Sequence, residues 1–284
     1  MTHSHPHTID GAPVTCGTLE AAMADDGAGL RLTVELARRL GEPHAGADGR
    51  HADEPSPFGA GDLVGTIGAV CVLRTVRADA GGAGVSAICK APVEGPVQVH
   101  ALGLVGDQQG DHAYHGGRDK ALYVMDGAEV RHWSTVLGGV EPGRMGENLT
   151  IEPGPLGGVD DVELGSVLTV GDPAHGGLRL LVTGVRNPCP TFARGVGRGD
   201  WVEVFSARGR VGVYLRVLTE GQVRAGDEVR LETAPGHGVS CRRWFLHHDP
   251  RDARALLEAE AAGDLELVPF TRAYVEAAAV EQVG

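Results

Sequence analysis

The sequence lacks paired cysteines and long apolar runs. Its five cysteines, at positions 16, 71, 89, 189 and 241, contain no C-x-x-C pair, so neither a disulfide framework nor a cysteine-rich zinc or iron–sulfur site is indicated. This cysteine usage favours a reducing, cytoplasmic setting. The opening residues MTHSHPHTID do not resemble a signal peptide, and no run reaches the ~18 apolar residues that span a bilayer.

The sequence also lacks positive charge. Its formal net charge is −13. Binding to nucleic acid or to an anionic membrane is driven largely by Lys and Arg, which neutralise phosphates, so an acidic chain is poorly suited to either. We therefore expect neither nucleic acid nor a membrane among its partners.

Aromatic residues are scarce at 4%, whereas the 44 glycines are about twice the usual share of ~7%. Short apolar runs bounded by Gly and Pro predict strands. Turns containing Gly precede the alternating segments ELGSVLTVGD and VRAGDEVRL, which is typical of repeated hairpins in antiparallel barrels. We predict a mainly β fold with one closed or nearly closed barrel. Its expected strands lie at 64–73, 96–102, 166–171, 178–185, 210–218 and 228–232.

The chain divides into three predicted parts. Residues 1–61 form an N-terminal extension, with one amphipathic helix near 27–40 and a polar linker at 41–61. Residues 62–236 form the barrel domain. Residues 237–284 form a small helical domain, in which Asp249 can cap a helix that starts at Pro250, and a second helix starts at Pro269. We interpret this helical part as structural cover for the barrel.

The segment GDQQGDHAYHGGRDKALYV, residues 106–124, is a candidate binding loop. Its paired glycines allow close approach of the backbone to a ligand, and Asp119 and Lys120 supply charge. The composition alone favours a simpler interpretation, a hairpin turn with a structural Asp–Lys pair. His112 and His115 lack a third ligand at matching spacing, so we do not predict a zinc site.

Cys189 is the second candidate. It lies in VRNPCPTF between Pro188 and Pro190, whose rings fix φ and present the thiol in one orientation. Arg186 nearby favours the thiolate, the form that soft metals and sulfur transfer require. A lone cysteine is more often a small buried hydrophobe, as we expect for Cys71, and the residues alone leave that interpretation the stronger for Cys189 too.

Several motifs, in order along the chain, resemble the MOSC (molybdenum cofactor sulfurase C-terminal) domain family, and most of all its free-standing bacterial YiiM-like branch. The resemblance covers about residues 63–235 and extends into the helical tail. Its motifs are VSAICKAPVEGPVQV, LGLVGDQQGD, HGGRDKAL, GENLTI, RNPCPTF and YLRVLTEGQVRAGDEVRL.

The resemblance implies a β-barrel with pyruvate-kinase-barrel-like topology and a pocket for molybdenum cofactor (molybdopterin). Cys189 matches the family's cysteine, which ligates molybdenum or carries sulfur, and Asn148 matches an asparagine beside the pterin. The other residues implied to bind the cofactor are His115, Gly116, Gly117 and Lys120, in the signature H-G-G-x-D-K-A, with Thr150 and Arg186 as lesser candidates.

Three functions follow from the resemblance, in order of preference. The first is a molybdenum-dependent oxidoreductase that reduces a small N-hydroxylated substrate. Its electrons would come from a separate reductase, because the chain has no flavin, haem or iron–sulfur motif. The second is a sulfur transferase with a persulfide on Cys189, loaded by a cysteine desulfurase. The third is a non-catalytic carrier of the cofactor. The family often has Asp or Phe where Cys89 stands, and the extension at 1–61 leaves the partner open.

Overall fold

The computed structural model describes residues 54–81, 84–108 and 116–280. The predicted helix near 27–40, residues 41–53 of the linker and His115 therefore lie outside the described residues. Among the described residues, no helix is both long enough and apolar enough to cross a membrane.

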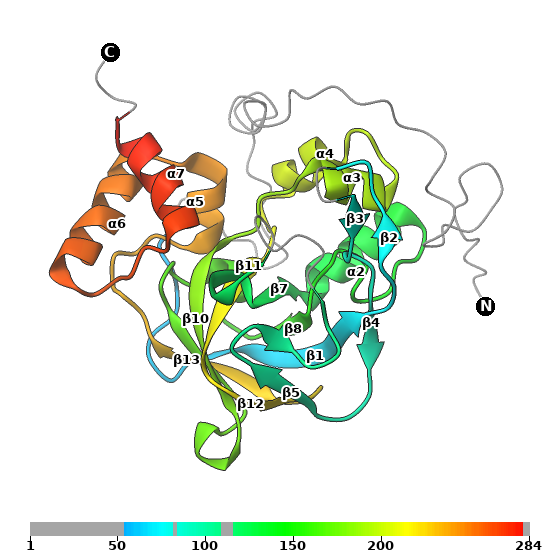
Figure 1. The fold of residues 1–284 in the computed structure, drawn as a ribbon. Helices are drawn as coiled ribbons and strands as arrows, with labels where there is room; N and C mark the ends of the chain where they lie inside the picture. The colour runs from blue at the N-terminus through cyan, green and yellow to red at the C-terminus, as the bar shows by residue number, and fades with distance from the viewer. Residues whose placement is uncertain (1–53, 82–83, 109–115, 281–284) are drawn as a thin grey trace, which may run out of the picture.

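A closed barrel of seven strands forms the centre of the molecule (Figure 1). The strands hydrogen-bond in the order β13, β9, β10, β11, β7, β8 and β1, and β1 pairs back with β13 to close the barrel. The predicted mainly β barrel is thereby confirmed. The strands are β1 (Leu63–Leu73), β7 (Leu122–Asp126), β8 (Leu149–Pro153), β9 (Val167–Val170), β10 (Leu178–Val185), β11 (Val213–Thr219) and β13 (Glu228–Thr233).

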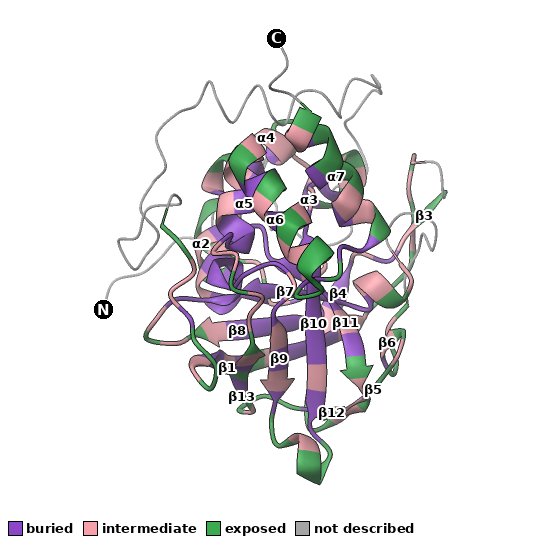
Figure 2. Ribbon diagram, turned by 90° about the vertical axis from the view of Figure 1, so that its left-hand side faces the viewer, coloured by how far each residue is buried: buried purple, intermediate pink, exposed green. Residues whose placement is uncertain are grey.

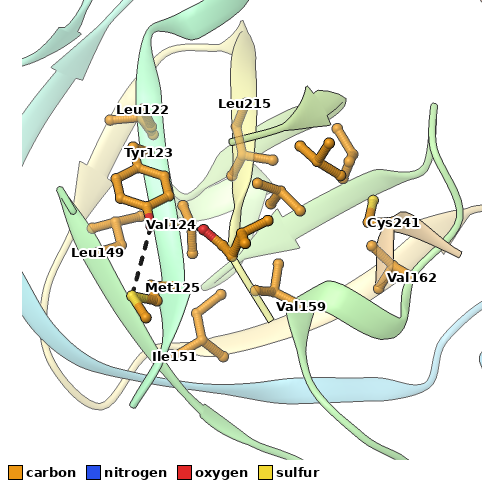
Figure 3. Close-up of a cluster of buried hydrophobic side chains, with 14 of the residues drawn as sticks. Leu122, Tyr123, Val124, Met125, Leu149, Ile151, Val159, Val162, Leu215 and Cys241 are labelled. Carbon is orange, nitrogen blue, oxygen red and sulfur yellow. Dashed lines mark hydrogen bonds between the residues drawn. The ribbon is translucent and has the colours of Figure 1, made fainter. Parts of the chain in front are cut away.

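The barrel interior is packed with aliphatic side chains. Leu122 and Val124 of β7 point toward Leu149 and Ile151 of β8 and toward Leu215 of β11 (Figure 3), and all five are at most 1% exposed. Alternate residues of a strand face the same side, so these positions form the inner face. Strands β7 and β10 are almost wholly buried (Figure 2) because helices and loops cover their outer sides as well.

One strand pair departs from the predicted antiparallel pattern. Strands β7 and β8 pair in parallel, and parallel strands need a crossover connection. Helix α2 (Gly127–Leu137) forms part of that connection and ends at Gly138, whose φ is 77°. The sequence analysis did not predict this helix.

Two further unpredicted helices, α3 (Pro190–Val196) and α4 (Trp201–Arg208), lie between β10 and β11. Their aromatic rings pack against α2. The ring centroids of Trp133 and Trp201 are 4.8 Å apart, and those of Trp133 and Phe205 are 5.4 Å apart. This aromatic cluster fixes the position of α3, which begins directly after Cys189.

Helices α5 (Cys241–His247), α6 (Pro250–Ala262) and α7 (Pro269–Val280) follow the barrel. The side chain of Asp249 caps α6, and Gly263 ends that helix, so both predicted helix starts are confirmed. The remaining short elements are β2 (Arg77–Ala78), β3 (Val85–Ser86), β4 (Lys90–Val93), β5 (Val97–His100), β6 (Gly103–Leu104), β12 (Gly221–Val223), and the 3-10 turns η1 (Arg118–Lys120), η2 (Val159–Asp161) and η3 (Pro173–His175).

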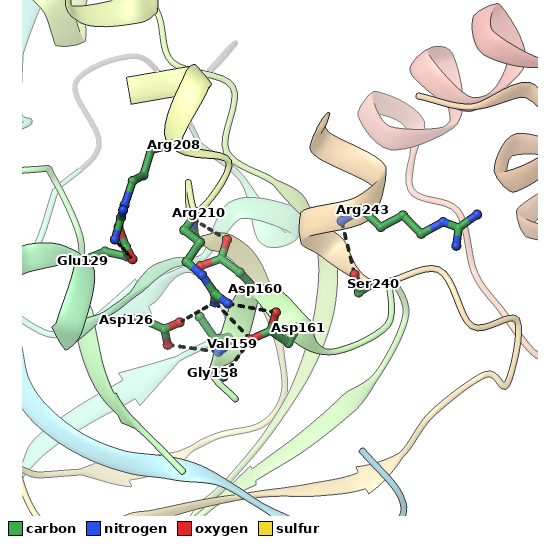
Figure 4. Close-up of polar contacts among 11 residues, drawn as sticks. Asp126, Glu129, Gly158, Val159, Asp160, Asp161, Arg208, Arg210, Ser240 and Arg243 are labelled. Atoms are coloured by element: carbon green, nitrogen blue, oxygen red, sulfur yellow. Dashed lines mark hydrogen bonds and ion pairs between the residues drawn. The ribbon is translucent and has the colours of Figure 1, made fainter. Parts of the chain in front are cut away.

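A buried charge cluster joins η2 to the barrel (Figure 4). It consists of Arg210 and the three carboxylates of Asp126, Asp160 and Asp161, and we call it the Arg210 cluster. The guanidinium of Arg210 lies 3.0 Å from Asp161 Oδ2 and 3.7 Å from Asp126 Oδ2. Asp160 accepts the N–H of Gly212 at 2.9 Å. Burial raises the pKa of Asp160 to about 7.

Candidate functional site

Cys189 carries a half-buried thiol and lies between the end of β10 and the start of α3. Its backbone is extended, with φ at −133°, and Pro190 is the first residue of α3. The carbonyl of Cys189 accepts the N–H of Ala193 at 3.1 Å. The backbone that carries the thiol is therefore fixed between the strand end and the helix start.

Arg186 lies buried beside Cys189, at 5% exposure. Its guanidinium carbon is 4.0 Å from the ring centroid of Phe192 and 4.5 Å from that of Tyr123, and Nη1 donates to the carbonyl of Met145. Burial works to lower the pKa of Arg186, but the neighbouring Tyr123, Tyr214 and Cys189 outweigh burial and raise it. Arg186 therefore remains a cation next to the thiol.

Asn148, which precedes β8, is fully engaged within the protein. Its Oδ1 accepts the N–H of Tyr123 at 3.1 Å, and its Nδ2 donates to Asp107 Oδ2 at 2.7 Å and to the carbonyl of Cys71 at 3.4 Å. The side chain thus ties β7 to β1 and holds Asp107. Asn148 therefore holds the surrounding residues in place through these hydrogen bonds.

Lys90 and Asp107 form an ion pair next to Asn148, with both side chains only 7% exposed. Burial lowers the pKa of Lys90, while Asp107 opposes that effect. Asp107 Oδ1 is buried without a hydrogen-bond partner among the described residues. The sequence analysis recognised the motifs SAICKAPV and GDQQGD that contain these residues, but it did not assign either residue to the site.

Glu147 is a third residue that the sequence analysis missed, although it lies in the recognised motif GENLT. Its side chain is completely buried. Oε1 accepts the N–H of Gly143 at 2.5 Å, while Oε2 has no hydrogen-bond partner within the described part of the chain. Burial raises the pKa of Glu147 to about 7, against the opposing effects of the Gly143 N–H and of Arg186.

Gly116, Gly117 and Lys120 lie in and before η1. Gly117 has a φ of 89°, a left-handed conformation that favours glycine, and no described residue lies within 4 Å of where a Cβ would be. Lys120 Nζ lies 4.3 Å from the ring centroid of Phe270 and 5.4 Å from that of Tyr214.

Tyr214 connects this loop to Cys189. Burial raises the pKa of Tyr214, Arg186 lowers it and Cys189 adds to the rise, because both groups are close to the phenol. The structure thus brings Cys189, Arg186 and Lys120 together around Tyr214, and Met145 links Arg186 to the loop before Asn148.

Thr150 lies away from this arrangement. It is the second residue of β8, and its hydroxyl faces Gly68 of β1, on the same side as Glu152. Glu152 pairs with Arg131 at 2.7 Å on the outer surface.

The fold and the described site define a β-barrel that is followed in the chain by helices. The model of the MOSC domain family matches residues 111–230. The chain is 28% identical to the protein YflK of Bacillus subtilis (strain 168) over 174 residues, which covers 60% of this chain and 74% of YflK. It is 29% identical to the protein YiiM of Escherichia coli (strain K12) over 184 residues, which covers 61% of this chain and 78% of YiiM.

Solved structures of YiiM share this fold. The structure from Geobacillus stearothermophilus covers 75% of this chain and 98% of its own, with a TM-score of 0.55 and 23% identity. The Escherichia coli structure covers 77% of this chain and 95% of its own, with a TM-score of 0.53 and 19% identity. Residues 111–230 therefore match the MOSC domain, and the chain is similar in sequence and fold to YiiM, in agreement with the resemblance of its motifs.

Proposed function

We propose that this protein binds molybdenum cofactor beside Cys189, with the Cys189 thiolate as a ligand to molybdenum, and that it reduces small N-hydroxylated compounds. MOSC domains are associated in general with this cofactor. The observation that carries the proposal is a half-buried thiol, fixed between two prolines and next to the buried cation of Arg186.

The residues present fit such a group. A thiolate is a soft ligand of the kind that heavier transition metals accept. Lys120 and Arg186 supply positive charge for a phosphate group. Asp107 and Glu147 each have a carboxylate oxygen without a partner among the described residues, and these oxygens are acceptors for the N–H groups of a pterin.

When bound, the cofactor would supply a two-electron reduction that removes the oxygen atom from the substrate. The overall change is R–NHOH plus two electrons and two protons, giving R–NH₂ and water. Arg186 holds a permanent positive charge beside Cys189 and favours its thiolate form. Asn148 fixes Asp107 and the ends of β7 and β1, which keeps the surroundings of the cofactor rigid. The electrons would come from a separate reductase.

A second function rests on the same pair of residues. A half-buried thiol beside Arg186 is also suited to carry a persulfide, because the cation stabilises the sulfur anion. Sulfur would then arrive from a cysteine desulfurase and leave to an acceptor, with no redox metal bound. A third function, as a cofactor carrier, shares the metal but not the turnover.

Elemental analysis of protein purified from cells with active cofactor synthesis tests the proposal. We expect close to stoichiometric molybdenum in the wild type and almost none in Cys189→Ser. Reduction of an N-hydroxylated compound with a chemical electron donor then separates the reductase from the carrier. Molybdenum-free wild type that carries a persulfide would establish the second function, and a fully active Cys189→Ser would overturn the site.

The matched control is Cys241→Ala. Cys241 carries a free thiol, but it is completely buried in α5, and it lies close to the carboxylates of Asp160 and Asp161. Cys71 is less suitable, because its backbone N–H and carbonyl both bond to Asn148. Cys241→Ala should retain the wild-type molybdenum content.

A further inference from the structure

Lysine is rare in this chain. Lys90 and Lys120 are its only two lysines, and arginine supplies the rest of the 25 basic residues. Both lysines lie at the candidate site, one in the ion pair with Asp107 and the other over aromatic rings. A lysine ammonium is a compact charge on a flexible stem, and it binds phosphate as a point charge. Its usefulness at a site therefore depends on what holds the stem.

The ring of Phe270 in helix α7 lies close to the Lys120 ammonium, at 4.3 Å from Nζ to the ring centroid. The ring centroid of Tyr214 lies 5.4 Å from Nζ, and the rings of Phe270 and Tyr214 meet edge to face at 90°, with their centroids 6.2 Å apart. A cation within about 6 Å of an aromatic face is attracted by the negative potential of the ring. The two rings together therefore bind the ammonium through cation–π contacts.

Helix α7 is fixed to barrel strand β10 next to these two rings. Gly184 of β10 has no side chain, and a Cβ there would lie only 2.6 Å from Cε2 of Phe270. The next residue, Thr271, donates its hydroxyl to the carbonyl of Thr183 at 2.6 Å. The position of the Phe270 ring is thus set by the barrel strand, independently of Lys120.

The turn that carries Lys120 is anchored as well. Arg216 of β11 donates from Nε to Asp119 Oδ1 at 2.7 Å, and from Nη1 to Glu266, just before α7, at 2.9 Å. The hydroxyl of Thr183 also donates to the carbonyl of Asp119. Both partners of the Lys120–Phe270 contact are therefore held in place by other bonds.

We propose that Phe270 is a positioning residue that holds the Lys120 ammonium at a subsite for a phosphate group, which makes the C-terminal helices part of the binding site. The inference rests on the proposed function only for the identity of the phosphate-bearing ligand. It changes the role of the helical tail, which the sequence alone suggested was structural cover.

The contact itself can be measured without any cofactor. In protein labelled with ¹³C-lysine, only two sets of ε-methylene signals arise, one from each lysine. The ring current of Phe270 should shift the Lys120 signals upfield in the wild type and in Phe270→Tyr. The shift should be largely lost in Phe270→Leu, which removes the ring but keeps an apolar side chain. Signals at the ordinary lysine position in the wild type would overturn the inference.

Titration with inorganic phosphate, followed on the same Lys120 signals, tests the subsite. Phe270→Leu should weaken phosphate binding by about three- to tenfold, the amount expected from one cation–π contact. Phe270→Tyr should bind like the wild type. Val275→Ala is the matched control, because Val275 is completely buried in the same helix and its truncation costs packing without touching Lys120.

The outcomes separate this inference from the proposed function. Phosphate binding that depends on the ring, in a protein that never holds molybdenum, would support the subsite and contradict the proposed function. Equal phosphate binding by folded Phe270→Leu and wild type would overturn the subsite whatever the metal content. Failure of the wild type to bind phosphate would do the same.

Discussion

The amide of Asn148 uses all of its polar atoms within the protein, on Tyr123, Asp107 and Cys71. Because these bonds lie within the protein, removing the amide should cost stability in the absence of any ligand. We expect Asn148→Ala to lower the free energy of unfolding by about 2–4 kcal/mol, because buried polar groups lose their partners. Urea denaturation measures it. Asn187→Ala, at a half-buried loop position, is the control. If Asn148→Ala has the same free energy of unfolding as the wild type, Asn148 does not hold these residues together.

The buried carboxyl of Glu147 should make the stability of the folded protein depend on pH. Its pKa is raised by burial to about 7 in the folded protein, above the ordinary value that it regains on unfolding. The folded state therefore holds its proton more tightly, and stability is lost as the pH rises through 7. We expect Glu147→Gln to match the wild type near about pH 5 and to gain on it by about pH 8. Urea denaturation at both pH values measures the difference, which should not grow with pH if the inference is wrong.

At the scale of single elements, the fit of α7 against β10 depends on Gly184. A Cβ at this position would clash with Thr271 and Phe270. We expect Gly184→Ala to cost about 1–3 kcal/mol, as overpacking usually does, and to weaken phosphate binding at Lys120. Gly59→Ala is the control, since its added Cβ would meet only Asp62 at 3.6 Å. Thermal unfolding checks both variants, and an equal effect of the two would contradict a special role for Gly184.

Strands were easier to predict than the helices between them. Runs such as 178–185 are bounded by Gly and Pro, and the structure has β10 at these residues. Helices α3 and α4 have only seven and eight residues, too few to establish a helical period. They are stabilised by the contacts of Trp133, Trp201 and Phe205, which connect residues far apart in the chain. No local pattern contains such contacts.

At the scale of the whole molecule, the candidate site is assembled from separate segments. Arg186 and Cys189 are close in sequence, and their local pattern suggested a site. Lys90 of β4, Asp107 after β6 and Glu147 before β8 are brought together only by the fold. The resemblance identified the motifs that contain these residues, but the sequence alone does not show that the three side chains lie close together. The contact between Phe270 and Lys120, which are about 150 residues apart in the chain, also could not be predicted from the sequence.

The whole molecule is expected to unfold as one unit, because a single hydrophobic cluster runs from the barrel into α5, α6 and α7. The Arg210 cluster lies within this unit. Removing its cation in Arg210→Met leaves three buried carboxylates facing one another, at a cost of about 3–5 kcal/mol. Circular dichroism and tryptophan fluorescence should show one transition that moves to lower temperature with both probes together.

The cost should also depend on pH. Burial, and next the charge of Asp160, raise the pKa of Asp126 well above its ordinary value, and burial raises that of Asp160 to about 7. Both carboxylates can therefore take up protons as the pH falls, so the deficit of Arg210→Met should shrink toward about pH 5. Arg230→Met, which breaks an exposed pair with Glu228, should cost at most about 1 kcal/mol at any pH. A deficit of Arg210→Met that stays constant with pH would show that the carboxylates are not the cause.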